Sequence, residues 1–281
     1  MKNLPLNYEM LRKTQHDVRK SNMIRLTDIA NLIEQTAPLR LQEEWDNCGW
    51  QVGPLTNEAT GALLCVDVTP EVLDEAIAKE CNLIVSHHPL IFSGMKKLSP
   101  SDSTAALVIK AIKNGVSIYS SHTAMDRAAD GVSGMMCRKL GLKNCTILDN
   151  PEGTEGLGMI GDTEFPYTED DYLSKVKETF NCQSVRYSDL RGKSIERVAV
   201  CGGSGSFLID EALRQGADIF ITADVKYHQY FTSLGKMIIA DIGHFESEQF
   251  TKEIFFNIIS KKLPTFALYF SETGKSPINS L

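Results

Sequence analysis

The sequence predicts an α/β protein of two domains with mostly parallel sheets. From Ile24 onward, short apolar runs alternate with segments of helical spacing, the pattern of strands joined by crossover helices. A chain of 281 residues with 42% hydrophobic residues is long and apolar enough for two domain cores. A stretch rich in glycine at 149–161 separates two such patterns and marks the expected domain boundary.

Capping residues and apolar spacing mark the elements of the first half. Thr27 can cap a helix that carries Ile29 and Ile33 on one face. Thr69 and Pro70 form an N-cap followed by a proline at the first helical position, so a second helix begins there. The other expected elements are buried strands at 62–66, 83–85 and 117–119 and helices at 105–113 and 135–140.

The same alternation continues in the second half. Thr168 can cap a helix that contains Leu173, Val176 and Phe180. Further expected elements are strands at 184–187, 198–201 and 219–221, a helix at 207–214, an apolar run at 237–240, a helix around 254–259 and a strand at 266–270. Since the last segments can return to the first domain, the predicted domains are 23–148 with 237–281, and 149–236. Residues 1–22 are predicted to be an N-terminal extension.

The net charge and the cysteine content indicate which binding partners and which cellular compartment to expect. The 29 Lys and Arg against 36 Asp and Glu leave a net charge of −7, which argues against nucleic acid and against an anionic membrane surface. Seven cysteines without a CxxC pair are typical of a reducing compartment, so no structural disulfide is expected. There is no apolar stretch of membrane-spanning length and no secretion signal, so we expect a cytoplasmic protein.

Histidines and carboxylates follow three of the predicted strands. After the strands at 83–85, 117–119 and 237–240 come, respectively, His87 and His88, His122 and Asp126, and His244 and Glu248. The C-terminal ends of parallel strands share one edge of a sheet, where open α/β folds bind their ligands. We therefore expect these side chains to converge in one cleft.

The spacing and donor types of this group favour metal binding. His244 and Glu248 stand one helical turn apart and face the same way. His87 and His88 lie at a strand end beside Pro89, where both rings can serve one site or two adjacent ions. A single such histidine is more often a hydrogen-bonded core residue, but the group exceeds the three protein ligands of a usual catalytic zinc. Nitrogen and oxygen donors without cysteine suit zinc, iron, manganese, cobalt or nickel.

Three weaker signals have competing interpretations. The glycine turn at 202–205 follows a strand as a phosphate-binding loop would, but it lacks the third glycine or the lysine of the known motifs. A tight turn that lines the cleft is favoured. Asp224 and His228 are spaced i, i+4 and are either a catalytic pair in the cleft or a local hydrogen bond. Trp45 and Trp50 are expected in the core.

Several motifs together resemble one known family. They are Trp45-Asp46-Asn47, Val68-Thr69-Pro70, Ser86-His87-His88-Pro89, His122 through Asp126, Gly202 through Gly205, Asp224 to His228, and Asp241 through His244 to Glu248. From about Met23 to the C-terminus the sequence resembles the GTP cyclohydrolase 1 type 2 homologues, also called Nif3-like proteins. The long central insertion of some relatives is missing, so the compact form is expected.

The resemblance implies a Nif3-like fold with a dinuclear metal centre in the cleft between its domains. Two divalent metal ions would be held by His87, His88, Asp126, His244 and Glu248, with Glu248 as the bridging carboxylate. The resemblance also places His122 close to the centre, as a group that supports a ligand or faces the substrate. It implies ring-shaped homohexamers. His122, Asp224 and His228 are the candidate catalytic residues.

Three functions remain open from the sequence. Two close divalent ions favour hydrolysis, since they activate water and polarise the bond that it attacks. The family name suggests GTP as the small-molecule substrate, with ring opening at the purine imidazole carbon. A phosphoesterase or cyclic amidase would use the same centre. The third alternative is a metal-binding regulatory or partner-binding protein without turnover.

Overall fold

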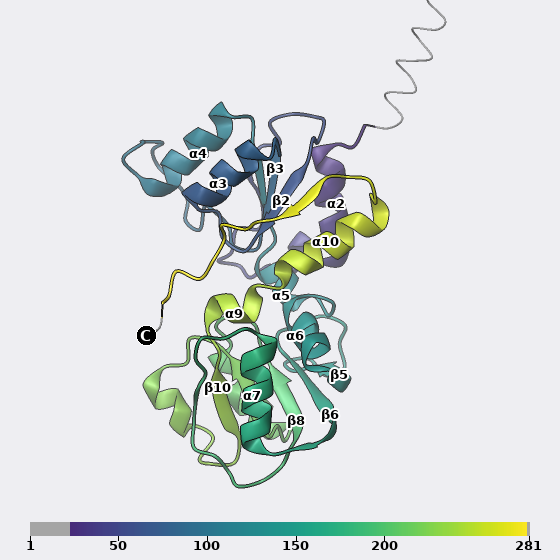
Figure 1. Cartoon of the computed structure of the whole chain (residues 1–281), viewed down its shortest axis with the longest axis vertical. Coiled ribbons are helices and arrows are strands. Elements are labelled where there is room, and N and C mark those ends of the chain that lie inside the picture. The colour runs from purple at the N-terminus through teal and green to yellow at the C-terminus, as the bar shows by residue number, and fades with distance from the viewer. Residues whose placement is uncertain (1–22, 280–281) are drawn as a thin grey trace, which may run out of the picture.

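The computed structural model describes residues 23–279, which form two lobes, each built around one sheet. Figure 1 shows the lobes along the long axis of the molecule, with α5 (Thr123–Arg127) and α9 (His244–Glu248) between them. The predicted extension at 1–22 lies outside the described residues. No helix within 23–279 combines the length and the apolar character that crossing a bilayer requires. The α/β class and the two-domain organisation of its sheets and helices are confirmed.

The first sheet has the order β1-β4-β3-β2-β11. Its strands are β1 (Gly49–Val52), β2 (Ala62–Cys65), β3 (Leu83–Ser86), β4 (Ser117–Ser120) and β11 (Leu268–Phe270). All neighbours pair in parallel except β1, which runs antiparallel to β4. Since β11 pairs with β2, the expected return of the C-terminal strand to the first sheet is confirmed. Strand β1 was not predicted, because a strand of four residues with two apolar side chains carries little periodicity.

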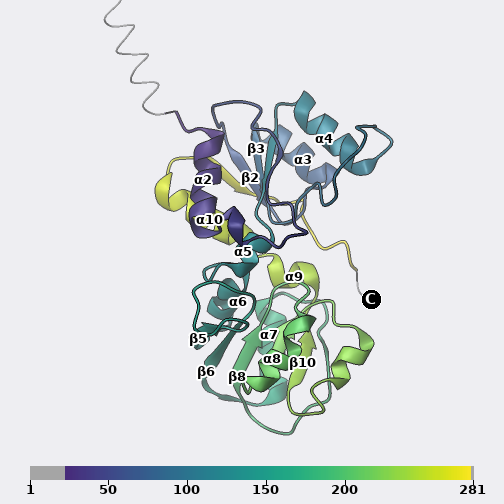
Figure 2. The same ribbon diagram turned by 180° about the vertical axis from the view of Figure 1, so that it is seen from behind.

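Helices cover both faces of the first sheet, as continuous apolar runs in its strands require. One face packs against α2 (Leu26–Thr36) and α10 (Thr251–Lys262), which lie together in Figure 2. The other face packs against α3 (Pro70–Ala78) and α4 (Ser103–Lys113). Neighbouring residues of β2 face opposite sides, with Leu64 toward α2 and Leu63 toward α3. This burial on both sides leaves the strand ends as the places where polar side chains can gather.

The second sheet is mixed, so the prediction of mostly parallel sheets is wrong for it. Its order is β5-β6-β8-β9-β10-β7, and only β8, β9 and β10 pair in parallel. The strands are β5 (Lys143–Ile147), β6 (Met159–Tyr167), β7 (Arg186–Tyr187), β8 (Ile195–Val200), β9 (Ile219–Thr222) and β10 (Ile238–Asp241). Strands β5 and β6 were not predicted, because β5 is largely exposed and β6 begins inside the glycine-rich stretch.

Two groups of helices cover the second sheet. On one face lie α6 (Val132–Leu140) and α7 (Glu169–Thr179), and on the other lies α8 (Ile209–Arg214), preceded by the 3₁₀ turn η2 (Ser206–Leu208). The turn η1 (Leu39–Leu41) precedes β1, and η3 (Tyr227–Phe231) follows β9. The single helix predicted at 207–214 is therefore two short elements.

Two predicted boundaries need correction. The segment at 237–240 was assigned to the first domain, but it forms β10 beside β9 in the second sheet, so the chain returns to the first lobe after α9. Helix α2 begins one residue before Thr27, and Arg25 occupies the N-cap position. The carboxylate of Asp28 accepts a hydrogen bond of 3.1 Å from the Arg25 backbone N–H. A side chain inside the first turn thus does the capping that was expected of Thr27.

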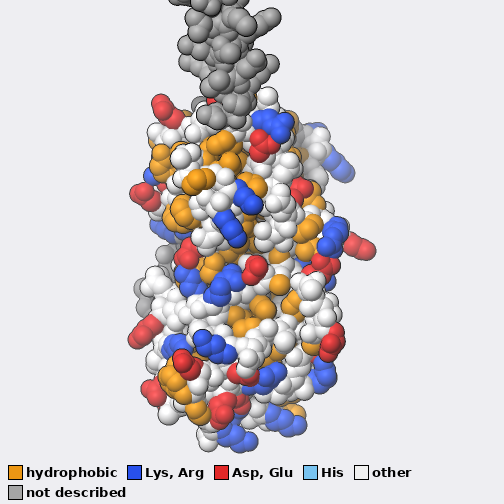
Figure 3. All heavy atoms as spheres, turned by 90° about the vertical axis from the view of Figure 1, so that its right-hand side faces the viewer, with side chains coloured by type: hydrophobic (Ala, Val, Ile, Leu, Met, Phe, Trp, Pro, Cys, Tyr) orange, Lys and Arg blue, Asp and Glu red, His pale blue; other side chains and the backbone are white. Residues whose placement is uncertain are grey.

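The charged side chains on one face of the molecule are mixed in sign. On the face shown in Figure 3, Lys and Arg side chains are interspersed with Asp and Glu side chains over both lobes. Binding to a phosphate backbone needs a continuous basic patch or stripe. This face presents a mixed surface instead.

A partly buried carboxylate in α3 connects the C-terminal segment to the first lobe. Glu75 accepts hydrogen bonds from the backbone N–H groups of Glu272 at 3.0 Å and Thr273 at 3.2 Å, and from the Ser271 hydroxyl at 2.8 Å. Burial alone would raise the pKa of Glu75, but these donors outweigh it and lower the pKa to about 2. The ionised carboxylate therefore stabilises the folded chain.

We expect Glu75→Gln to lower the free energy of unfolding by about 1–2 kcal/mol near neutral pH, because a neutral acceptor forms weaker hydrogen bonds. Since the folded-state pKa lies below the ordinary value of 4.5, this contribution is complete above that pH and is lost as the pH falls toward 2. Urea unfolding of both proteins at about pH 7 and about pH 3 measures the change. Glu178→Gln, at an exposed position of α7, is the control. An equal difference at both pH values would contradict the assignment.

Candidate metal centre

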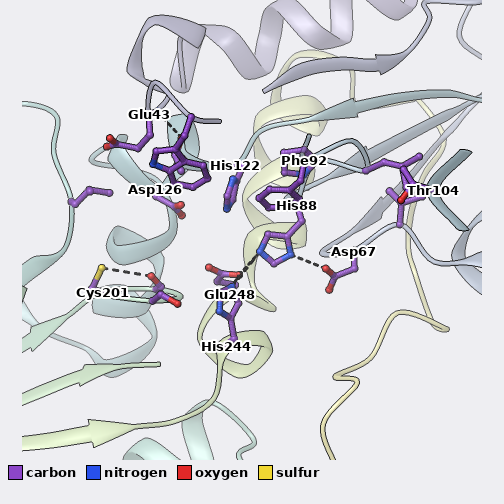
Figure 4. A pocket seen from close by; sticks show the side chains of 18 of the residues that line it. Glu43, Asp67, His88, Phe92, Thr104, His122, Asp126, Cys201, His244 and Glu248 are labelled. Carbon is purple, nitrogen blue, oxygen red and sulfur yellow. Dashed lines mark hydrogen bonds and ion pairs between the residues drawn. The ribbon is translucent and has the colours of Figure 1, made fainter. Parts of the chain in front are cut away.

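The ends of strands from both sheets meet at one cavity between the lobes. Its volume is about 880 Å³, within the range of small-molecule sites. The first lobe supplies His88 and His122 from the ends of β3 and β4, and α9 supplies His244 and Glu248 after β10. Asp126 enters from α5. Figure 4 shows His122, His88 and Glu248 directed toward one another. The expected convergence of these distant segments is therefore present in the structure.

All four histidines of the cluster engage an oxygen through Nδ1. The pairs are His87 with the Ser121 carbonyl oxygen at 3.0 Å, His88 with Asp67 at 2.7 Å, His122 with Asp46 at 2.9 Å, and His244 with Asp224 at 2.6 Å. An imidazole whose Nδ1–H is donated to an acceptor keeps its Nε2 lone pair for a metal, and its orientation is fixed. The cluster thus presents four oriented Nε2 atoms.

Glu248 lies at the centre of this arrangement and faces two different groups. Its Oε1 is 3.6 Å from His87 Nε2, and its Oε2 is 3.1 Å from His88 Nε2 and 3.2 Å from His244 Nε2. Asp126 Oδ1 is 3.6 Å from the same His87 nitrogen. Donors bound at about 2.0–2.2 Å to one zinc-sized ion stand about 3–3.5 Å apart, so these separations suit ions held between them.

Buried polar atoms without partners support the fit to a cation. His87 Nε2, Asp126 Oδ1 and Glu248 Oε2 are buried and make no hydrogen bond in good geometry. Such atoms are costly in a folded interior, and an unseen ion is one of their ordinary explanations. Three sets of donor atoms close enough to share an ion occur among the described residues: His87, His88 and His122; His88, His244 and Glu248; and His87, Asp126 and Glu248.

The pKa values of Asp126 and Glu248 are shifted in opposite directions. Burial raises the pKa of Asp126 well above its usual value, and the nearby charge of Glu248 raises it further. Burial acts on Glu248 in the same direction, but His87, His244 and His88 surround it and hold its pKa well below the usual value. Without a cation, a negative charge on Asp126 beside that of Glu248 is therefore unfavourable, and a divalent ion would relieve this repulsion.

The pKa values of the histidines are also shifted in different directions. Burial lowers the pKa of His87, which favours the neutral form of the ring that a metal ion binds. Burial also disfavours charge on His88 and His244, but Asp67 and Glu248 raise the pKa of His88 to about 10, while Glu248 and Asp224 raise that of His244 to about 9. Their Nε2 atoms are 3.3 Å apart. A cation between them would displace their protons.

The glycine turn at 202–205 makes room for Glu248. Gly203 has a left-handed backbone with φ of +61°, and a Cβ there would lie 2.3 Å from Glu248 Oε1. Its N–H donates to Ser247 Oγ at 2.8 Å, and the N–H of Gly205 donates to Thr222 Oγ1 at 2.9 Å. Since these amides are already satisfied by the protein, the turn lines the cleft rather than forming a nest for phosphate, as the sequence favoured.

The structure separates the three candidate catalytic residues. His122 lines the cavity, and its ring nitrogen belongs to a donor set with His87 and His88. Asp224 hydrogen-bonds His244 and the Ser204 hydroxyl, so it positions a ring of the cluster. His228 lies on η3, exposed, with its ring edge-on to Tyr227 at 5.2 Å, and it is not among the residues that line the cavity. Asp224 is thus paired with His244 and Ser204 rather than with His228. A catalytic role for His228 stays a prediction.

The sequence did not indicate that Asp46 and Asp67 form hydrogen bonds with histidines of the cluster. Asp46 accepts from His122, from the Thr123 backbone N–H at 3.0 Å and from the Thr123 hydroxyl at 2.5 Å, and these donors lower its pKa despite burial. Asp67 follows β2 and holds His88. The strand-end argument, applied to β2, would have found Asp67.

The two tryptophans have different surroundings. Trp50 packs edge-on against Tyr119 at 5.2 Å beside the first core, as expected. Trp45 is 62% exposed and lines the cavity, so its placement in the core is wrong. It lies in the loop between η1 and β1, where no regular periodicity fixes which side chains face the core.

Fold and site together define a two-lobed α/β protein with a candidate site for divalent cations between its sheets. Residues 24–277 match the family described as Duf34/NIF3 (NGG1p interacting factor 3). The chain belongs to this family, and the resemblance drawn from its motifs is confirmed.

Curated relatives and solved structures agree with this membership. The GTP cyclohydrolase 1 type 2 homolog of Clostridium acetobutylicum is 36% identical over 230 residues, which cover 80% of this chain and 85% of that protein. The homolog from a Nostoc species is 34% identical over 231 residues, 80% of this chain and 88% of its own. A crystal structure of a Staphylococcus aureus protein described as hypothetical superposes with a TM-score of 0.84 at 26% identity, over 92% of this chain and 100% of that one.

Proposed function

We propose that the protein is a metal-dependent hydrolase that holds two divalent cations in the cleft. His87, Asp126 and Glu248 Oε1 would hold one ion, and His88, His244 and Glu248 Oε2 the other. The observation that carries the proposal is the placement of the two Glu248 oxygens toward different donor groups, at 3.6 Å and at 3.1–3.2 Å. A carboxylate that bridges two ions needs this arrangement.

The chain's own residues supply orientation and proton transfer. When bound, two close divalent cations supply Lewis acidity that activates water and polarises the bond to be hydrolysed. Asp67, Asp224 and the Ser121 carbonyl hold the rings of the cluster in place. His122, turned toward the cavity by Asp46, can accept or donate a proton at Nε2. The nitrogen and oxygen donor set suits zinc, iron, manganese, cobalt or nickel.

The relatives' names make ring-opening hydrolysis the first reaction to test. Those names are GTP cyclohydrolase 1 type 2 homolog, and they point to attack of water on the imidazole ring of a purine. The cavity is large enough for a small molecule of that kind. Hydrolysis, rather than the particular substrate, is what the donor geometry supports.

We expect the protein loaded with one metal at a time to hydrolyse members of a panel of purine nucleosides, nucleotides, cyclic amides and phosphodiesters. Liquid chromatography with mass detection identifies products, and plasma emission counts the ions per chain. His88→Ala should reduce turnover at least about 100-fold, since it removes one metal donor. Tyr187→Ala, which also removes a ring but at an exposed position of β7 outside the cavity lining, is the control. Two bound ions without turnover on any substrate would favour the regulatory alternative.

A further inference from the structure

Three large aromatic side chains stand exposed in the cavity lining, and two of them, Trp45 and Phe92, lie beside the cluster. Trp45 is 62% exposed and Phe92 is 51% exposed, and both line the cavity. Side chains of this size and character normally bury most of their surface. Two of them held at the mouth of one cavity form a surface on which a flat molecule can stack.

Both rings contact the same histidine edge-on. The centroids of Trp45 and His122 are 5.8 Å apart at 72°, and those of Phe92 and His122 are 5.5 Å apart at 73°. Phe92 also lies 6.5 Å from the His88 ring. In Figure 4, Phe92 adjoins His88 and His122, and all three border the space above Glu248. A flat molecule on these rings therefore lies next to the candidate metal donors.

The charge of the lining restricts what else the molecule can carry. Among the described residues, the cavity lining contains no Lys or Arg, while its carboxylates are Glu43, Asp67, Asp126 and Glu248. The nearby guanidinium of Arg127 is already paired with Glu43 at 3.0 Å. A triphosphate carries several negative charges and is normally bound by Lys, Arg, a glycine-rich nest or a divalent cation. Here the lining offers no Lys or Arg among the described residues, and the amides of Gly203 and Gly205 are occupied, so only the proposed cations could attract the phosphates.

We propose, on the basis of the function proposed above, that the substrate is a planar heteroaromatic molecule without a polyphosphate group. Its ring stacks on Trp45 and Phe92, and its reacting bond lies over the cluster near His122 and Glu248. The chain thus recognises a nucleobase-like ring, and a triphosphate tail adds nothing to its binding.

Calorimetry on the full chain tests this with guanosine, GTP and ribose as probes, in metal-free and zinc-loaded protein. We expect guanosine to bind in both forms, because the chain itself holds the rings, ribose not to bind, and GTP to bind no more tightly than guanosine. Trp45→Leu and Phe92→Leu should each weaken guanosine binding about tenfold. Phe165→Leu, at a ring of β6 that is 54% exposed and outside the cavity lining, should leave it unchanged.

Two results would overturn the inference: tighter binding of GTP than of guanosine, or guanosine binding that neither leucine variant weakens. Circular dichroism and zinc content of the variants establish that they fold and keep their metal. Ring-dependent binding of guanosine without any hydrolysis would remove the proposed function alone. Hydrolysis that persists unchanged in Trp45→Leu and Phe92→Leu would remove the stacking surface alone.

Discussion

Replacing Glu248 by glutamine is expected to lower metal affinity more than 100-fold and to abolish hydrolysis. Loss of a group that merely supports a metal ligand costs about 10–100-fold, and Glu248 contacts both donor groups itself. The amide cannot bridge two cations. It also removes the buried negative charge that raises the pKa of His88 and of His244. Plasma emission on dialysed protein gives the number of ions per chain.

Two further variants make this result specific. Glu246→Gln changes a half-buried acid on the same helix, two residues away and outside the cavity lining, and it should keep both ions. Glu248→Asp keeps the charge but shortens the side chain, so we expect it to hold fewer than two ions. If folded Glu248→Gln retains two ions and full turnover, the assignment of Glu248 as the bridging ligand is wrong.

Gly203→Ala is expected to have the second largest effect. The added methyl would lie 2.3 Å from Glu248 Oε1, and Glu248 cannot move away freely because it is only 2% exposed. We expect metal affinity to fall at least about tenfold, since the carboxylate is displaced by a fraction of an ångström or more. The left-handed backbone adds about 1–2 kcal/mol of strain to the folded state. Metal titration and urea unfolding measure the two effects separately.

Gly216→Ala is the matched control for backbone strain. Gly216 also has a left-handed backbone, with φ of +75°, but a Cβ there meets nothing within 4 Å. We expect a similar loss of stability with unchanged metal affinity. Equal metal affinities in both variants would show that the glycine turn does not hold Glu248 in place.

Much of the cluster could be predicted from local sequence, because strand ends are local features. Apolar runs located β3, β4 and β10 closely, and His88, His122 and His244 follow those strands within a few residues. The Nδ1 partners were harder to predict. Asp46, Asp67 and Asp224 lie 76, 21 and 20 residues from their histidines, and nothing local to either partner shows the pairing. Such hydrogen bonds are tertiary contacts.

The second sheet was predicted less well, for related reasons. Strands β5 and β6 lack the apolar run that marks a strand buried on both faces, and their pairing is antiparallel. Strand β10 was located, but its sheet was not, because β9 and the first sheet are equally acceptable neighbours for an apolar segment of four residues.

The sequence by itself determined the α/β class, most of the buried strands and which side chains could bind a metal, because periodicity and donor chemistry are properties of neighbouring residues. Only the tertiary structure decided that two sheets from separate lobes bring their strand ends to one cavity, that Glu248 faces two donor groups, and that Trp45 is exposed beside them. Those outcomes depend on packing between segments more than a hundred residues apart, and short-range patterns carry no information about such distances.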